Sequence, residues 1–476
     1  MKFSKLKSNL LFILFLFTLL FSNVQYLKQE VFSSDIKIKL NSITTETKLE
    51  LIWEQIYEGP FVEEGKSIIK CPGNGYVISG WTNSSGVGDL DVLVMRIADD
   101  GTHQWNVTIG DVEEDKGFQV ISLQSGGYAV ISTYMNTSAV HTNSDIMLTR
   151  IAEDGTIQWN KYYSGPEQDD VTSWVGDLGR SIVECSNGDI ALAGVTVTDE
   201  GNCDVYLFRV APNGILLWNR TFHNWDIDRC YTPHSLVLCD DGGFALACYT
   251  YNETQSNDVW IIRTNQFGVH LWNKTYGDSG GYQRPEGLVQ CSDGGFAIIA
   301  NTHTFCLGYS DAWVIRTDSF GNQLWNQTYG GEESDGGGFI AELPNEDLVF
   351  SGTTHSFDVG NGDAWLVRIA MNGSLIWNHT LGNEYGNSGG PFVNEGNDTY
   401  TVLGGTMRVG ESFGDIWIFK TQIVTYYINE STPTLTPSTT TETESGSISM
   451  FILINEFLIT AFFIIKVKKK KKANLT

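Results

Sequence analysis

Short apolar runs alternate with turn residues rich in Gly, Asp and Asn along most of the chain. One stretch shows the pattern clearly, with apolar runs at 286–291, 296–302, 312–317 and 323–329. In the last run, QLWNQTY, apolar and polar residues alternate, which is the period of a half-buried strand. Runs of this length and spacing predict four short antiparallel β-strands joined by tight turns.

This four-strand unit repeats. The tryptophan of its last run recurs every 52–59 residues, as Trp53, Trp105, Trp159, Trp218, Trp272, Trp325 and Trp377. A glycine stands four residues before six of these tryptophans, and an Asp-x-x-x-x-Arg phrase ends nine residues before the same six. A four-stranded sheet cannot bury both of its faces alone, so units of about 50 residues in series predict a β-propeller.

The two ends of the repeat region complement each other. The first unit begins at Trp53 with no Asp-x-x-x-x-Arg strand before it, and the last such strand, 415–420, has no tryptophan phrase after it. The N-terminal strand therefore completes the last blade and leaves no free sheet edge. We predict an all-β fold over residues 50–424: a seven-bladed β-propeller of four-stranded antiparallel blades, closed by an N-terminal outer strand that joins the last blade.

The repeated tryptophan phrase predicts packing rather than chemistry. Alternation places Trp325 and Tyr329 on one face of their strand and Asn326 and Thr328 on the other. We expect the tryptophan to pack on the neighbouring blade, close to its turn glycine, with a gain of about 2–3 kcal/mol per blade. The outward asparagine opens N-x-T sequons, so the glycosylation candidates are Asn106, Asn219, Asn273, Asn326 and Asn378. The alternative is that Asn and Thr are only edge residues of the repeat.

Segments outside the repeats predict where the protein is located in the cell. Residues 1–24 resemble a signal peptide, with three lysines before an apolar run, although a retained N-terminal anchor is an alternative. After an N-terminal lead (25–49) and the propeller, a Thr/Ser/Pro-rich stalk (425–448), an apolar segment (449–467) and a basic tail (468–476) follow. This order predicts a single-pass cell-membrane protein with a large extracellular domain, a C-terminal transmembrane helix and a cytoplasmic tail.

Charge and cysteine content narrow the choice of partners. The formal net charge of −26 disfavours nucleic acid as a partner. Cys203 and Cys230 fall in loops that should be neighbours on one face, which makes a disulfide between them plausible in an exported protein. No CxxC pair occurs, so we expect no metal cluster. The loop 358–363, DVGNGD, offers oxygen ligands that suit Ca²⁺ but lacks EF-hand spacing.

The phrases ADDGTHQW (98–105), AEDGTIQW (152–159) and APNGILLW (211–218) resemble the tryptophan-docking motif of PQQ-type quinoprotein propellers. The whole unit is similar to repeat propellers of secreted and surface-anchored archaeal and bacterial proteins, some labelled endoglucanase-like. The resemblance implies a propeller fold and a surface location. Quinoprotein enzymes typically have eight blades and a vicinal cysteine pair. Seven blades and no Cys-Cys sequence predict that this chain has no quinone cofactor.

Variable loops on the fixed scaffold are the expected place for function. Exposed aromatic residues beside charged ones suit a carbohydrate-binding surface, and ordinary loop packing is the alternative. The candidate ligand-binding residues are Asp169, Asp170, Trp174, Trp225, Asp226, Tyr282, Arg284 and Tyr309. We predict that the loop face binds an extracellular glycan, peptide or surface protein. A carbohydrate-active enzyme using loop carboxylates and a structural envelope component are the alternatives. The sequence assigns no catalytic residue and leaves the oligomeric state open.

Overall fold

A computed structural model of the chain describes residues 44–428, except for 139–140, 165–176, 198–202, 225–226, 231, 252–256, 279–280, 358–360, 384–385 and 408–413. The predicted signal peptide, transmembrane helix, basic tail and most of the predicted stalk lie outside the described residues. Within the described part, no helix has the length and apolar character needed to cross a membrane.

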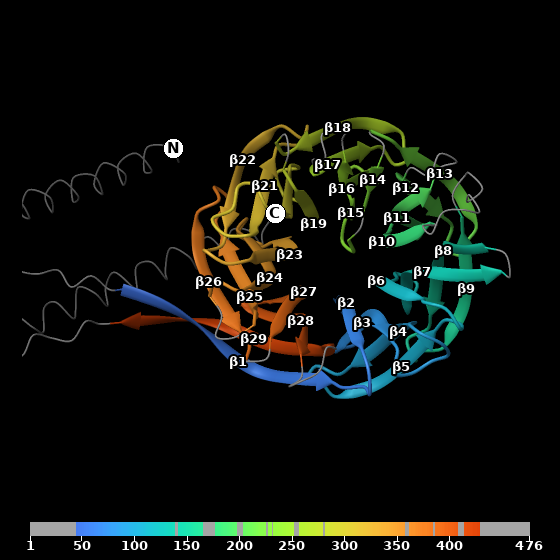
Figure 1. Ribbon diagram of the computed structural model, residues 1–476, viewed down its shortest axis with the longest axis horizontal. Coiled ribbons are helices and arrows are strands. Elements are labelled where there is room, and N and C mark those ends of the chain that lie inside the picture. Colours follow the sequence, from blue (N-terminus) through green and yellow to red (C-terminus); the bar gives the residue numbers. More distant parts are fainter. Residues whose placement is uncertain are drawn as a thin grey trace, which may run out of the picture. The chain divides into compact units, whose positions relative to one another are not determined.

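Residues 45–426 form one compact unit in which seven blades are arranged in a ring (Figure 1), and we call the space that their innermost strands line the channel. The innermost strands are β2 (Glu63–Lys70), β6 (Lys116–Ser122), β10 (Leu178–Glu184), β15 (Leu236–Leu238), β19 (Gln283–Gln290), β23 (Asp335–Glu342) and β27 (Asn387–Gly396). The second strands are β3 (Tyr76–Thr82), β7 (Tyr128–Ser138), β11 (Ile190–Val197), β16 (Phe244–Tyr251), β20 (Phe296–Thr302), β24 (Leu348–Thr354) and β28 (Thr399–Met407).

The outer half of each blade carries the two repeated phrases. The third strands are β4 (Asp91–Ile97), β8 (His141–Ile151), β12 (Cys203–Val210), β17 (Asn257–Thr264), β21 (Asp311–Thr317), β25 (Asp363–Ile369) and β29 (Gly414–Ile428). The outermost strands are β5 (His103–Ile109), β9 (Ile157–Tyr163), β13 (Leu216–Phe222), β18 (His270–Tyr276), β22 (Gln323–Tyr329), β26 (Leu375–Leu381) and β1 (Thr44–Tyr57). The predicted all-β fold of seven antiparallel four-stranded blades is confirmed.

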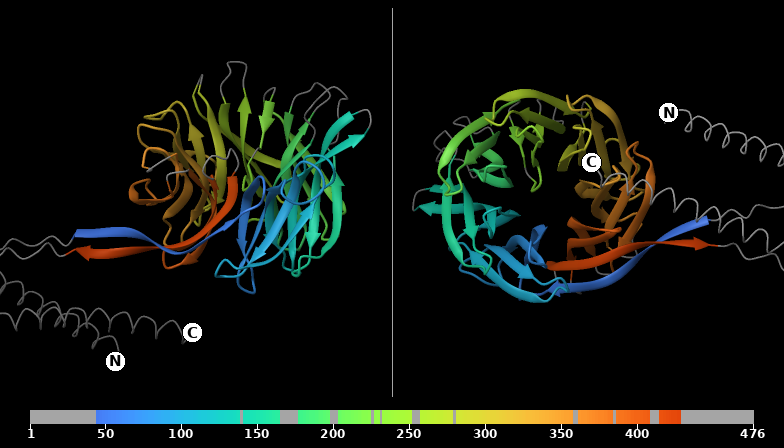
Figure 2. Two further views of the ribbon diagram at one scale, coloured as in Figure 1. Left: turned by 60° about the horizontal axis from the view of Figure 1, so that its bottom comes forward. Right: turned by 180° about the vertical axis from the view of Figure 1, so that it is seen from behind.

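The ring closes as the sequence predicts, because β1 pairs with β29 at the edge of the last blade. Both strands are longer than expected and leave the ring side by side (Figure 2). Side chains support the pairing, since Thr421 Oγ1 donates to the Glu50 carbonyl at 2.9 Å and Lys48 lies over the Tyr426 ring. The two ends of the propeller are therefore held together.

Tryptophan docking joins each blade to the next. At the fifth blade, a Cβ on Gly321 would lie 2.6 Å from the Trp272 ring of the fourth blade, and Gly321 has a φ of +73°. The Tyr276 hydroxyl donates to the Gly321 carbonyl at 2.6 Å. The same tryptophan–glycine contact occurs at Gly101, Gly155, Gly214, Gly268 and Gly373. The predicted structural role of the phrase is confirmed.

The arginine of the Asp-x-x-x-x-Arg phrase is structural as well. Arg316 is 1% exposed, and its guanidinium binds Asp293 at 2.6 Å in the turn between β19 and β20. It also donates to the Phe296 and Thr317 carbonyls. Arg263 makes the corresponding contacts in the fourth blade. The repeated arginine thus fixes the turn between the first two strands of its blade.

Apolar side chains fill the space between adjacent blades. A cluster of buried residues lies at each of the seven junctions, including the closing one, where Ile68 and Tyr76 of the first blade meet Leu403 and Ile418 of the last. Because each blade buries one face on each neighbour, the ring has no exposed sheet face to cover.

The predicted Cys203–Cys230 disulfide is wrong, because Cys230 is bonded to Cys248. The reason is a short extra strand, β14 (Ile227–Arg229), which runs antiparallel to β16 and brings Cys230 opposite Cys248. Cys203 stands next to Ile227 through the parallel pairing of β12 with β14, and it remains a buried free thiol.

Candidate functional site

Six of the seven innermost strands have an irregularity at one position, and the residues at that position line the channel. In β2, Gly65 and Ser67 pair with successive residues of β3, and Lys66 between them is unpaired. The same slip occurs in β6, β10, β19 and β23, and β27 has a larger irregularity in which two residues stand opposite Leu403 of β28. Bulges re-aim side chains, and they are common next to functional sites.

The bulge positions bring different chemistry to one ring around the channel. They are Lys66 in β2, Phe118 in β6, Arg180 in β10, Glu286 in β19, Gly338 in β23, and Gly390 with Pro391 in β27. The fourth blade breaks the pattern, because the segment between β14 and β15 carries Pro233 and His234 into the channel instead. We call these residues the bulge ring.

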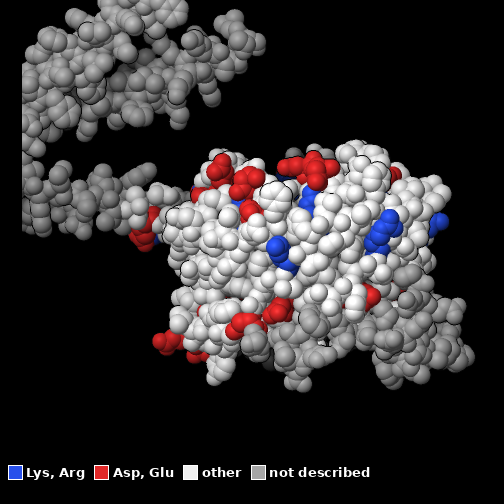
Figure 3. Space-filling model, turned by 90° about the horizontal axis from the view of Figure 1, so that it is seen from above, with Lys and Arg blue, Asp and Glu red and all other residues white. Residues whose placement is uncertain are grey.

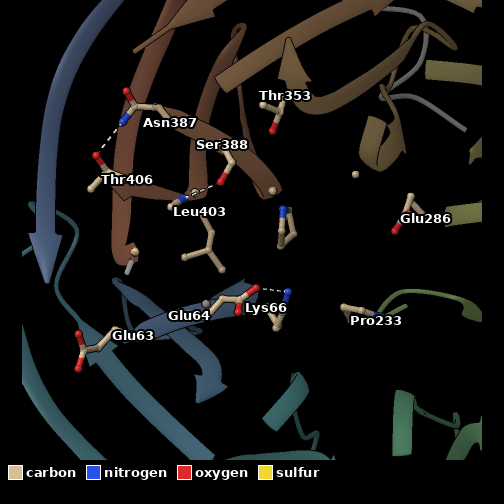
Figure 4. A pocket seen from close by; sticks show the side chains of 18 of the residues that line it. Glu63, Glu64, Lys66, Pro233, Glu286, Thr353, Asn387, Ser388, Leu403 and Thr406 are labelled. Carbon is tan, nitrogen blue, oxygen red and sulfur yellow. Dashed lines mark hydrogen bonds and ion pairs between the residues drawn. The ribbon is translucent and has the colours of Figure 1, made fainter. Parts of the chain in front are cut away.

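The bulge ring lines a cavity of about 800 Å³. One wall is open because it is built largely of glycine, including Gly338, Gly389 and Gly404. Glu63 and Asn387, the first residues of β2 and β27, also line the cavity. In Figure 4, Lys66 and Glu286 approach the open centre from different sides, and Glu63 lies away at the margin. The volume matches that of small-ligand sites rather than of flat protein interfaces.

Cations and aromatic rings are stacked along the first three blades. Lys66 Nζ lies 4.7 Å and Lys116 Nζ 5.9 Å from the centre of the Trp81 ring. The Arg180 guanidinium lies 3.9 Å from the centre of the Phe118 ring, and Arg180 is 7% exposed. Aromatic faces hold cations in place without neutralising them. This wall can therefore offer positive charge to a ligand.

Glu286 is the bulge-ring carboxyl, and its side chain is 18% exposed. Burial raises the pKa of Glu286 to about 7, although Arg284, Lys66 and a hydrogen bond from Asn301 favour the ionised form. Its Oε1 atom lies 3.3 Å from Arg284 Nε. A carboxyl that titrates near neutrality in a cavity is suited to exchange a proton with a ligand.

His234 lies at the bulge ring with a φ of +68°. Its Nδ1 atom lies 3.2 Å from Gln119 Nε2, and its ring packs edge-on against Phe339, so the segment reaches across from the fourth blade to the second and sixth. Burial lowers the pKa of His234 to about 4, while the Lys66 backbone opposes the shift. His234 is therefore neutral at ordinary pH, and it cannot cancel a nearby negative charge.

A smaller cavity of about 330 Å³ adjoins the first and shares Arg284 and Glu286 with it. Tyr282 and His303 line this space and pack edge-on, with ring centres 5.0 Å apart. Of the residues predicted to bind a ligand, Tyr282 and Arg284 are thus brought together, on β19 and the loop just before it.

The other predicted ligand residues fare differently. Tyr309 is 76% exposed and lines neither cavity. Residues predicted to bind a ligand at Asp169, Asp170, Trp174, Trp225 and Asp226 lie outside the described residues, as does part of the proposed Ca²⁺ loop 358–363.

Four bulge-ring residues escaped sequence reasoning, namely Lys66, Phe118, Arg180 and Glu286. A signal exists in retrospect, because EGKSI, KGFQV and LGRSI share a glycine followed by one variable residue. The variable residue is the bulged one.

The sequon asparagines all lie on outermost strands, as expected. Asn106, Asn273 and Asn326 are exposed, whereas Asn219 and Asn378 are half-buried. Asn219 Nδ2 donates to the Tyr206 hydroxyl at 3.0 Å. Glycosylation of these sites stays a prediction.

Within the described residues, one group of three side chains has metal-ligand geometry: Asp204, His223 and Asp228. His223 Nδ1 lies 2.9 Å from Asp204 Oδ1 and 3.7 Å from Asp228 Oδ2. The sequence had predicted no metal site here. The group lies at a blade junction, apart from the bulge ring.

The outer wall differs from the channel in charge. In the side view of Figure 3, acidic residues gather along both rims and only scattered Lys and Arg lie between them. This agrees with 56 acidic and 30 basic residues in the chain. Lys66, Lys116, Arg180 and Arg284 all line one cavity, and they share its lining with the carboxyl groups of Glu63, Glu64, Glu286 and Asp415.

Neither a family model nor a curated protein matches the chain. Solved structures with a similar fold include polysaccharide lyase Uly1 (8% identity, TM-score 0.45, 83% of this chain and 95% of that one). A protein from Lactobacillus plantarum (14%, 0.44, 68% and 85%) and the β-propeller domain of the Trilobed protease from Pyrococcus furiosus (9%, 0.41, 77% and 96%) are others. Similarity at this level carries no argument about activity.

Proposed function

We propose that the protein binds an acidic extracellular sugar in its bulge-ring cavity. The proposal rests mainly on one wall of the cavity, where Lys66, Lys116 and Arg180 stack on Trp81 and Phe118. Cations held over aromatic rings present charge and a flat apolar surface side by side. A sugar carboxylate meets the cations, while the sugar ring packs beside Trp81, which is half-buried, whereas Phe118 is buried under Arg180.

The size and form of the site favour a small ligand over a protein surface. The cavity lies among the innermost strands and is also lined by residues of β3, β24 and β28, and its glycine wall leaves room beside the cations. A folded partner would cover the mouth without reaching Arg180. A single acidic sugar, or the end of an acidic polysaccharide, fits the available volume.

The cavity is also lined by carboxylates, and these limit where a ligand can place its negative charge and how many such charges it can carry. Glu64 pairs with Lys66, and Glu286 lies beside Arg284. Lys116 is paired as well, with Glu114 at 2.7 Å, so an ionised ligand carboxylate must compete with protein carboxylates for the cations, and it avoids the side of Glu286. A ligand with several closely spaced negative charges would be disfavoured.

Binding is tested by titrating the protein with uronic-acid oligosaccharides and with neutral oligosaccharides of the same length, in a calorimeter. We expect saturable binding of the acidic series that weakens with salt, since charged contacts are screened. Arg180→Gln should weaken binding about tenfold or more, because it removes a charge-assisted hydrogen bond.

Lys161→Gln is the matched control, because Lys161 is an exposed lysine on the outermost strand β9. Its affinity should equal that of the unchanged protein. Equal binding of both sugar series, or equal losses in the two variants, would exclude the cavity as an acidic-sugar site.

A second candidate function rests on Glu286 alone. Because its pKa is about 7, Glu286 can act as a general acid or base on a bound sugar. The test is whether the protein cleaves a bound oligosaccharide. If it does, and if Glu286→Gln abolishes this cleavage, the cavity is the active site of a carbohydrate-active enzyme.

We further propose that the propeller stands outside the cell on a C-terminal anchor. The stalk, the apolar segment 449–467 and the following lysines support this location. This location is tested by adding a protease to intact cells. We expect the propeller to be cleaved, and protection of the propeller would contradict an extracellular location.

A further inference from the structure

The junction between the fourth and fifth blades contains two buried acceptor atoms that face one small space. Among the described residues, Asp258 Oδ1 on β17 and Gln283 Oε1 on β19 have no hydrogen-bond partner. The Gln283 side chain is 0% exposed. A Cβ on Gly277 would lie 2.0 Å from the first oxygen and 3.0 Å from the second, so they are near neighbours. Two buried acceptors without a donor lower the stability of the folded protein. A proton or a cation bound between them would remove this cost.

The orientation of the Gln283 amide follows from its other contacts. Its Nε2 atom donates to Asp278 Oδ1 at 3.1 Å and to Thr304 Oγ1 at 3.0 Å. A reversed amide would turn the oxygen toward the Asp278 carboxylate, which is unfavourable. The hydrogen bonds of Gln283 therefore hold Oε1 toward Asp258.

At two other junctions a side chain satisfies the corresponding oxygen. In the second blade, Ser164 Oγ donates to Asp145 Oδ1 at 2.7 Å. In the third, His223 Nδ1 lies 2.9 Å from Asp204 Oδ1. Ser164 and His223 directly follow an outermost strand, and Gly277 stands in the same position of its own blade. The fourth blade has a glycine there, like the first, fifth and sixth blades with Gly110, Gly330 and Gly382, so this position offers Asp258 no side-chain donor.

The next junction has a related but weaker arrangement. Asp311 Oδ1 is also buried without a partner among the described residues. Asp335 beside it accepts hydrogen bonds at both oxygens, including 2.7 Å from Gly331 N and 3.1 Å from His355 N. That junction leaves one oxygen open rather than two.

We propose that the space between Asp258 and Gln283 binds a Ca²⁺ ion. Carboxylate and amide oxygens are the ligands of a hard cation, and Ca²⁺ tolerates irregular sites completed by water. Asp278, whose carboxylate holds the Gln283 amide, adds negative charge beside the ion. With two protein ligands, we expect half-saturation at about 0.1–1 mM, as in extracellular calcium modules.

A proton is the competing occupant. Burial and the charge of Asp278 raise the pKa of Asp258, and a protonated Asp258 would itself donate to Gln283 Oε1. Asp258→Asn imitates that protonated form, because its amide can donate to Gln283 in the same position. With Ca²⁺ as the occupant, this substitution removes calcium binding, whereas with a proton as the occupant neither the unchanged protein nor the variant binds calcium in this space.

The test uses the full-length chain, with melting temperature and bound ⁴⁵Ca²⁺ measured in chelator and in 5 mM Ca²⁺ (on the order of ten times the half-saturation range). We expect Ca²⁺ to raise the melting temperature by about 3 °C or more and to bind to the unchanged protein. Asp258→Asn should lose one bound ion and most of the shift. Asp145→Asn, at the junction already satisfied by Ser164, should keep both.

A second variant guards against misfolding of the first. Gln283→Glu adds a carboxylate to the site, so it should tighten calcium binding several-fold. The proposal is overturned if the unchanged protein shows no calcium dependence, if Asp258→Asn retains it, or if Gln283→Glu leaves the affinity unchanged.

Discussion

Replacing Glu286 by Gln should stabilise the propeller at alkaline pH and have little effect at acid pH. The pKa of Glu286 in the folded protein is about 7, against an ordinary value of 4.5. Because the native state holds this proton more tightly than the unfolded chain, stability is lost as pH rises from 4.5 through 7. The full loss applies above pH 7 and amounts to about 3 kcal/mol.

The assay is urea unfolding of the unchanged protein and of Glu286→Gln at pH 4.5 and pH 8. At pH 8 the variant should exceed the unchanged protein in unfolding free energy by about 3 kcal/mol, since it avoids burying the charge. At pH 4.5 the two should differ by less than about 1 kcal/mol.

Glu64→Gln is the control. Glu64 lines the same cavity, but it is 45% exposed and pairs with Lys66 near the surface of the channel. Such an exposed ion pair contributes little to stability, so this variant should follow the unchanged protein at both pH values. An equal difference between Glu286→Gln and the unchanged protein at pH 4.5 and pH 8 would refute the burial of a titrating carboxyl at this position.

Two further predictions concern stability. Gly321→Ala should unfold several degrees below Gly294→Ala in a thermal melt, because both glycines have φ near +80° but only Gly321 packs against Trp272; equal melting temperatures would argue against tryptophan docking. Reduction of the Cys230–Cys248 disulfide, which spans 18 residues, should cost about 3 kcal/mol in calorimetry, and an unchanged transition after confirmed reduction would contradict it.

The sequence predicts those parts of the fold that repeat. Trp325, its partner Gly373 and Arg316 recur at fixed spacing because each blade must meet the next in the same way. Closure of the ring could be predicted as well, because the extra strand at the N-terminal end is the strand that the last blade lacks. These features are set by local pairing and by packing between neighbours, which periodicity displays directly.

The candidate site escaped prediction for the complementary reason. Lys66, Arg180 and Glu286 occupy a position of the repeat at which the residue type differs from blade to blade. The periodicity of the sequence therefore does not reveal them. His234 enters the ring only because the inner strand of the fourth blade is interrupted. The Cys230–Cys248 bond depends on that same irregularity.

The most direct test of the account is a crystal structure of the protein with an acidic oligosaccharide. We expect a sugar carboxylate inside the bulge-ring cavity, within hydrogen-bond reach of Arg180 or Lys116, and a sugar ring beside Trp81. A sugar bound on the outer wall or at Tyr309, with the cavity holding only water, would contradict it.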